Sequence, residues 1–127
     1  MRDCAIQLTH HPGDLARVAE ALAARGVNIK ALAGMSINGV AVTRILPDDI
    51  VAARSAFEAA KIRFTESEVH VVLLENKAGV LASVTNRLGD AHVNLEAIYV
   101  TGITDDLVEL AIVSDNPKKA KKILEEF

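Results

Sequence analysis

The chain has 127 residues, of which 50% are apolar and 24% are charged, with a formal net charge of −3. This composition is that of a folded globular protein, and it argues against a nucleic-acid-binding face because there is no basic excess and only 3% of the residues are aromatic. The single cysteine, Cys4, excludes an internal disulfide and a two-cysteine metal site. The sequence has no recognisable signal peptide or membrane-spanning run, so we expect a cytoplasmic protein without membrane contacts.

The first half of the sequence predicts the element order β-α-β-β-α-β. Short apolar runs indicate strands at residues 4–8, 27–37, 40–46 and 62–65. Apolar residues at helical spacing indicate one helix that begins near Asp14 and ends at Gly26, and a second helix over residues 49–60. Asn38-Gly39 is typical of a two-residue hairpin turn. The inner face of the second helix is expected to carry Val51, Ala52, Phe57 and Ala60.

The second half repeats this order but stops after its second helix. Strands are expected at residues 69–74, 93–103 and 107–113, with one helix near Leu81 and a last one that Asn116 caps and that runs to Phe127. Because no fourth strand follows, the strand at 69–74 should lie at an uncovered sheet edge. We therefore expect two units, residues 1–67 and 68–127, joined by a short linker at residues 66–68, and at least a homodimer that covers this edge.

The two halves are copies of one pattern. Residues 3–37 and 69–103 share ten identities in thirty-five aligned positions, without a gap. Gly13 and Gly79 match, and each is followed fifteen residues later by an asparagine, Asn28 or Asn94. Beyond the hairpin the offset grows by one residue, which predicts a longer turn in the second copy.

The loop that contains each glycine is a candidate ligand site. A helix N-terminus has free N–H groups, which attract small anions such as the carboxylate of an amino acid. A plainer interpretation is that the glycines serve tight turns and that the asparagines satisfy nearby backbone groups. The candidate ligand-binding residues are His10, Gly13, Asp14 and Asn28 in the first copy, and Asn76, Gly79, Val80, Leu81 and Asn94 in the second.

Several other classes of protein with this element order need residues that the chain lacks. An RNA-recognition module needs aromatic residues on its central strands, and a copper chaperone needs two thiols in its first loop. An acylphosphatase-like enzyme needs an arginine there, for which Lys77 is a weak substitute. No set of nucleophile and base is visible at a usable spacing. We therefore expect no enzyme activity, no cofactor and no bound metal.

The stretches His10–Leu15 and Glu75–Leu81, each with its later Val-Asn pair, resemble the ACT domain. Nearly the whole chain is similar to a small stand-alone protein of two tandem ACT domains. The resemblance implies an α+β fold of two ferredoxin-like units with antiparallel sheets, the second lacking its last strand. It also implies that an effector binds where the first loop of one unit meets a neighbouring unit.

The serine-binding ACT domain of phosphoglycerate dehydrogenase offers a residue-by-residue match. The resemblance implies that Asn76 and Asn94 hold the ligand in the second copy, and that His10 and Asn28 take these places in the first. A histidine of that pattern is replaced by leucine in both copies, so specificity for serine is not carried over. The prediction is a non-catalytic, allosteric regulatory protein that binds an amino acid and acts on a metabolic enzyme or regulator. The alternative is a regulatory subunit that acts through its sheet edges without a small ligand.

Overall fold

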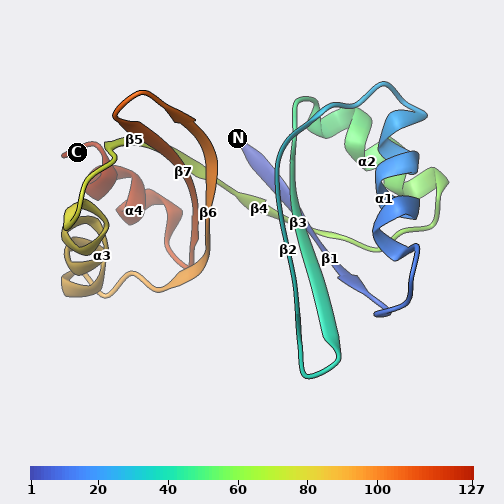
Figure 1. Cartoon of the computed structure of the whole chain (residues 1–127), viewed down its shortest axis with the longest axis horizontal. Coiled ribbons are helices and arrows are strands. Elements are labelled where there is room, and N and C mark those ends of the chain that lie inside the picture. Colours follow the sequence, from blue (N-terminus) through green and yellow to red (C-terminus); the bar gives the residue numbers. More distant parts are fainter. The chain divides into compact units, whose positions relative to one another are not determined.

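The computed structural model describes residues 1–127, which divide by their internal contacts into two units. The N-terminal unit is Arg2–Ser67, and the C-terminal unit is Glu68–Phe127 with Met1. The first seven elements are β1 (Arg2–Leu8), α1 (Asp14–Ala23), β2 (Ile29–Ile37), β3 (Val40–Pro47), α2 (Ile50–Ala59), β4 (Thr65–Glu68) and β5 (His70–Glu75). The remaining four are α3 (Val80–Asp90), β6 (Leu95–Thr104), β7 (Leu107–Ser114) and α4 (Pro117–Leu124) (Figure 1). None of these helices has the length and apolar character needed to cross a membrane.

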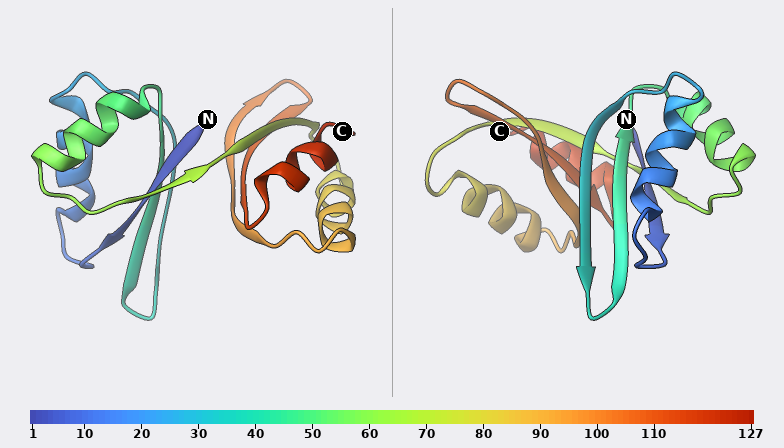
Figure 2. Two further views of the ribbon diagram at one scale, coloured as in Figure 1. Left: turned by 180° about the vertical axis from the view of Figure 1, so that it is seen from behind. Right: turned by 45° about the vertical axis from the view of Figure 1, so that its right-hand side comes forward.

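The N-terminal unit is a four-stranded sheet in the order β2-β3-β1-β4, with α1 and α2 on one face (Figures 1 and 2). β3 pairs antiparallel with β1 on one side and with β2 on the other. The turn between β2 and β3 is formed by Asn38, with φ 51°, and Gly39, with φ 79°. Two successive positive φ angles suit a tight hairpin, so the turn predicted from Asn-Gly is confirmed.

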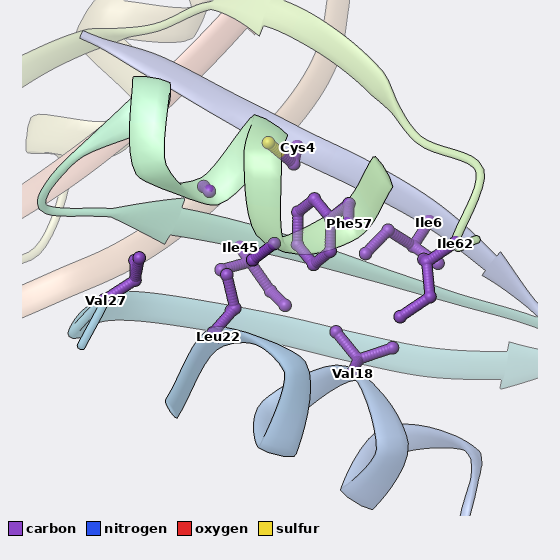
Figure 3. Close-up of a cluster of buried hydrophobic side chains, with 10 residues drawn as sticks. Cys4, Ile6, Val18, Leu22, Val27, Ile45, Phe57 and Ile62 are labelled. Carbon is purple, nitrogen blue, oxygen red and sulfur yellow. The ribbon is translucent and has the colours of Figure 1, made fainter. Parts of the chain in front are cut away.

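The N-terminal core lies between the sheet and its two helices (Figure 3). Phe57 is fully buried there, and α2 also contributes Ala53 and Ala56 at helical spacing. Val51, expected on the inner face, is instead 65% exposed. The helix begins one residue before it, after a cap in which Asp49 accepts a hydrogen bond from the N–H of Ala52. That start turns Val51 outward.

The fourth strand begins three residues later than the sequence predicts. Lys61 adopts φ 57°, and the N–H of Ile62 donates to the carbonyl oxygen of Phe57 at 2.8 Å. This is a Schellman closure of α2, in which Ile62 packs its side chain into the core instead of beginning a strand. β4 therefore starts at Thr65, and residues 66–68, which were expected to be a linker, all belong to this strand.

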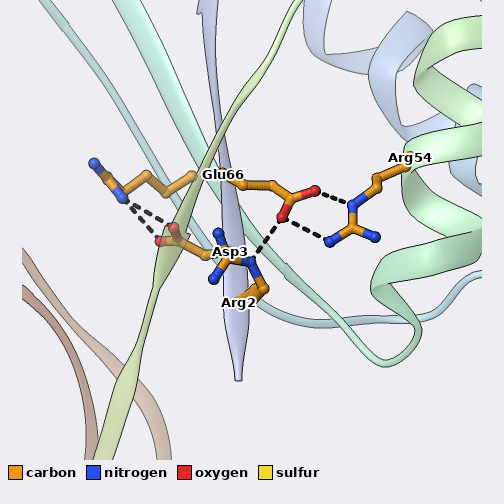
Figure 4. A network of polar contacts seen from close by, with 5 residues as sticks. Arg2, Asp3, Arg54 and Glu66 are labelled. Atoms are coloured by element: carbon orange, nitrogen blue, oxygen red, sulfur yellow. Dashed lines mark hydrogen bonds and ion pairs between the residues drawn. The ribbon is translucent and has the colours of Figure 1, made fainter. Parts of the chain in front are cut away.

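Glu66 connects β4 to two arginines (Figure 4). Its Oε2 accepts a hydrogen bond from Nε of Arg2 at 2.7 Å and one from Nη2 of Arg54 at 2.9 Å, and its Oε1 accepts from Nε of Arg54. These bonds, led by those from Arg54, lower the pKa of Glu66 to about 2. Cys4 lies in the adjacent core, where burial and then the charge of Glu66 raise the pKa of its thiol to about 12. Cys4 is therefore a packing residue at neutral pH.

The C-terminal unit is a three-stranded sheet in the order β5-β7-β6, with α3 and α4 packed on one face (Figure 1). Its core includes Val84 and Leu88 from α3 and Ile123 from α4. Asn116 caps α4 by accepting a hydrogen bond from the N–H of Lys119, as predicted, although the helix ends at Leu124. The missing fourth strand is confirmed, and β5 lies at the edge of the sheet.

The extra residue of the second copy lies inside β6 and not in the turn. Both hairpins have two-residue turns, Asn38-Gly39 and Asp105-Asp106. β6 has 10 residues where β2 has 9, and its pairing with β7 shifts register between Val100 and Gly102. Thr101 is thus accommodated in a β-bulge, which absorbs one residue without reversing the faces of the strand. The expectation of a longer turn was wrong.

Candidate functional site

A glycine in the left-handed conformation begins the first helix of each unit. Gly13 has φ 92° and ψ −8°, and Gly79 has φ 91° and ψ −16°. No side chain caps either helix, so the N–H groups of the first turn keep no side-chain partner. An added Cβ would meet no atom within 4 Å at either position. The positive φ, and not a lack of space, is therefore what favours glycine.

The carboxylate of Asp14 holds the N-terminal loop together. Its Oδ2 accepts hydrogen bonds from Oγ1 of Thr9 at 2.6 Å, from the N–H of Thr9 at 2.9 Å and from the N–H of His11 at 3.2 Å. The side-chain bond from Thr9 and then the backbone bond from His11 lower the pKa of Asp14. Asp14 is thus an ionised residue of the loop framework. The matching residue of the C-terminal unit is Val80, which packs against the apolar core.

His10 and Asn76, which occupy matching positions, each join a first loop to the hairpin of the same unit. Nδ1 of His10 lies 3.2 Å from Oγ of Ser36 in β2. The N–H of Asn76 donates to the carbonyl oxygen of Asp106, in the β6–β7 turn, at 2.6 Å. Equivalent loops are therefore anchored in both units, by a side chain in one and by the backbone in the other.

Lys77 is engaged within its own loop. Its Nζ lies 2.7 Å from Oε2 of Glu75, and both side chains are exposed. The hydrogen bond between them raises the pKa of Lys77 and lowers that of Glu75. Lys77 is consequently not a free cation at the start of α3.

Asn28 and Asn94 are fixed through their backbones. The N–H of Asn28 donates to Oδ1 of Asp48 at 3.0 Å, and the N–H of Asn94 donates to Oδ1 of Asp115 at 2.9 Å. The two aspartates were not identified from the sequence. The available signal was an acidic residue directly before the capping residue of the second helix in both copies. Both asparagines are exposed.

The structure brings only some of the candidate residues together. A pocket of about 470 Å³ at the N-terminal loop is lined by His10, Gly13 and Asp14, with apolar walls from Leu8, Leu15 and Ala41. Asn28 does not line it, because Asn28 follows the far end of α1. A helix of 10 residues spans about 15 Å. The loop and Asn28 of one unit therefore lie at opposite ends of α1 and do not share one pocket. Asn94 is separated from Gly79 by α3 in the same way.

Residues 71–127, which make up most of the C-terminal unit, match the model of the ACT domain family. No protein with a curated description matches the sequence.

The fold of the whole chain is also found in solved structures. A protein from Bacteroides thetaiotaomicron has 24% identity and a TM-score of 0.86, over 98% of this chain and 86% of that one. The regulatory subunit of aspartate kinase from Thermus thermophilus has 19% identity and a TM-score of 0.71, over 98% and 87%. That from Thermus flavus has 17% identity and a TM-score of 0.70, over the same shares. The chain thus has the fold of two tandem ferredoxin-like units.

Proposed function

We propose that the chain is a non-catalytic regulatory protein of the cytoplasm that binds an amino acid through its first loops and acts on a metabolic enzyme. The match of residues 71–127 to the ACT domain family and the likeness to the regulatory subunit of aspartate kinase support a regulatory role. The observation that carries the proposal is the repeated loop. Two glycines at matching positions adopt the same left-handed conformation at helix starts that have no side-chain cap.

The chemistry of the N-terminal loop suits a zwitterion. The uncapped N–H groups at the start of α1 attract a carboxylate. The negative charge of Asp14, which lines the same pocket, attracts an ammonium group. An amino acid carries both groups, and the pocket of about 470 Å³ has room for one. In the C-terminal unit, Asn76, Val80 and Leu81 supply the corresponding loop without a carboxylate.

Asn28 and Asn94 lie too far from the glycine of their own unit to share a ligand with it. Since α1 and α3 separate the two positions, each asparagine would complete a site only with the loop of another unit, whether of the same chain or of a second copy. This geometry supports a proposal in which ligand binding and the association of units are coupled. An amino acid bound in this way would favour the associated state, which is how a small effector regulates a partner enzyme.

The alternative, a subunit that acts through its sheet edges alone, also has support. Met35, Ile37 and Val40, at the tip of the β2–β3 hairpin, are 63%, 62% and 53% exposed. Apolar side chains grouped in this way on a hairpin are typical of a protein-contact surface.

A thermal-shift screen with the twenty amino acids distinguishes the two functions. A ligand that binds only the folded state raises the melting temperature, and the rise continues with the logarithm of the ligand concentration once this exceeds the Kd. We expect one amino acid, or a small group of related ones, to raise it in a concentration-dependent manner. A melting temperature that no amino acid changes would refute the binding function and favour the sheet-edge alternative.

A further inference from the structure

A small pocket of about 110 Å³ lies on the other side of the N-terminal loop. It is formed by the end of β1, the start of α1 and the segment that follows α2. Its apolar walls come from Ile6, Val18 and Ile62, all of which belong to the N-terminal core. Three cationic residues also line it, namely Arg17, Lys61 and Arg63.

The late start of β4 accounts for this pocket. A strand was expected at residues 62–65, which would have placed residues 62–64 in the sheet. Instead, Lys61 and Ile62 complete the closure of α2, and the strand begins only at Thr65. Lys61 and Arg63 are thereby left beside the end of β1, where Gln7 and Thr9 also line the pocket.

The three cations have no anionic partner. The other arginines on β1, β3 and α2 form ion pairs, Arg2 and Arg54 with Glu66 and Arg44 with Asp3. Arg17, Lys61 and Arg63 have no carboxylate oxygen within 4.0 Å, and Arg17 donates only to the carbonyl oxygen of Ala60, at 3.1 Å. The three side chains are exposed, so solvent screens the repulsion between them, but all three would attract an anion that enters the pocket.

Asp14 is the one acidic residue that lines the pocket, and its Oδ2 is already occupied by three hydrogen bonds within the loop. The residues around the pocket therefore carry three positive charges and one negative charge. The surplus of two positive charges matches a dianion. A water molecule takes up about 30 Å³ in the liquid, so about 110 Å³ suits a compact group about the size of four water molecules.

We propose that this pocket binds a phosphate dianion through Arg17, Lys61 and Arg63. Arginine is well suited to this ligand because its planar guanidinium donates paired hydrogen bonds to phosphate oxygens. A neighbouring hollow of about 930 Å³ shares Gln7, Thr9 and Arg63 with the pocket. It provides room for the organic part of a phosphate monoester. The phosphate group is the common element, whether the ligand is inorganic phosphate or a monoester.

Calorimetric titration of the full chain with sodium phosphate, with sodium chloride as reference at equal ionic strength, tests the proposal. We expect saturable phosphate binding that chloride does not reproduce. Arg63→Gln and Lys61→Gln should each weaken it about tenfold or more, since loss of a charge-assisted contact worth about 1.4 kcal/mol corresponds to tenfold. Arg25→Gln and Lys30→Gln are the matched controls, because both residues are exposed, lie in the same unit and do not line the pocket.

Glycerol phosphate, titrated in parallel, identifies the source of the phosphate group. Binding tighter than that of inorganic phosphate indicates a monoester that uses the larger hollow, and equal binding indicates inorganic phosphate. Phosphate that binds no better than chloride, or equal losses in the Arg63→Gln and Arg25→Gln variants, would overturn the proposal. Melting temperatures without phosphate verify that each variant is folded. The response to amino acids should survive in Arg63→Gln, so a failure of this site is distinct from a failure of the amino-acid function.

Discussion

Asp48 and Asn28 exchange two hydrogen bonds in opposite directions. The N–H of Asn28 donates to Oδ1 of Asp48 at 3.0 Å, and the N–H of Asp48 donates to the carbonyl oxygen of Asn28, also at 3.0 Å. Asp115 and Asn94 repeat the arrangement at 2.9 Å and 3.0 Å. Each pair connects the residue before an edge strand with the residue before a helix cap. The backbones of both asparagines are thereby fixed while their side chains stay available.

The aspartates of these pairs should contribute to stability in both units. Asp48→Ala and Asp115→Ala each leave the backbone N–H of the asparagine without its acceptor. We expect each to lower the free energy of unfolding by about 1 kcal/mol, as is typical for a lost hydrogen bond. Urea denaturation measures the change. Asp90→Ala is the control, because Asp90 is exposed at the end of α3 and forms no ion pair. Losses no larger than that of the control would show that the pairs are not stabilising.

Asn94→Ala should weaken amino-acid binding more than it weakens the fold. The backbone bonds of Asn94 persist after the substitution, so the melting temperature without ligand should stay close to that of the wild type. A lost side-chain bond to a charged ligand group costs about 1–3 kcal/mol, or about five- to a hundred-fold in affinity. We expect a smaller affinity loss for Asn28→Ala, because Asn76 completes the family pattern only in the second copy. A ligand-induced shift that is unchanged in both variants would contradict the assignment of the asparagines.

Two glycines with equal space around them should respond to alanine in opposite directions. Neither Gly13 nor Gly89 has an atom within 4 Å of an added Cβ, but only Gly13 has a positive φ, 92°. Gly13→Ala should lower the free energy of unfolding by about 1–2 kcal/mol, the cost of a left-handed backbone for an ordinary residue. Gly89→Ala lies within α3 and should raise it by up to about 1 kcal/mol. Chemical denaturation of both variants tests this, and a stabilised Gly13→Ala variant would be inconsistent with the observed loop.

The contribution of Glu66 should disappear in acid. Its folded-state pKa, about 2, is below the ordinary value of 4.5, so its ion pairs stabilise the protein fully above that ordinary value. The stabilisation is lost as the pH falls from 4.5 towards 2. Glu66→Gln should therefore be less stable than the wild type at pH 7, and the difference should shrink as the pH is lowered through this range. Glu58→Gln, an exposed glutamate of the same unit without an ion pair, should show no such convergence. A difference that does not vary with pH would exclude the ion pairs as its cause.

The uncovered edge of β5 predicts self-association. An exposed strand edge offers unpaired backbone groups to a second chain, and Leu73 in this strand is 53% exposed. Light scattering should give at least a dimer, and Leu73→Lys should shift the protein towards the monomer. Val51→Lys, which changes an apolar residue on α2 that is 65% exposed, should have no effect. A mass of 13.6 kDa for the unmodified chain at micromolar concentration would contradict the prediction.

An element is predictable from the sequence where the conformation that its local residues favour is also the one that the fold requires. Gly26 and His92 both end the first helix of their unit in the left-handed conformation, with φ 67° and 59°. A glycine after a helical pattern predicts this conformation directly. For His92 the prediction comes from the repeat, in which His92 aligns with Gly26. The start of β4 was not predictable in this way, because Ile62 suits a strand by its pattern but serves as the apolar residue that closes α2.

The candidate site is less predictable than the fold. The glycines and their spacing are visible in the sequence, but the role of Asp14 depends on three donors that the folded loop places around it. The helix predicted from Asp14 to Gly26 already places Gly13 and Asn28 at its opposite ends, but only the structure shows which residues line the pocket beside Gly13. These contacts depend on where the side chains point and on how the helices and strands are oriented. The order of residue types along the chain specifies neither.

The bulge at Thr101 has a consequence for how the two copies diverge. An inserted residue inside a regular strand would exchange the buried and exposed faces of everything beyond it. Because the bulge absorbs the insertion, the paired base of the C-terminal hairpin is preserved while its tip is free to change. The turns now differ in charge, because Asn38 and Gly39 form one and Asp105 and Asp106 form the other, while exposed apolar residues such as Ile37 and Ile103 flank both. A partner that contacts a hairpin turn would meet a neutral surface in one unit and two carboxylates in the other, so the two halves of this duplicated scaffold could be distinguished by what binds them.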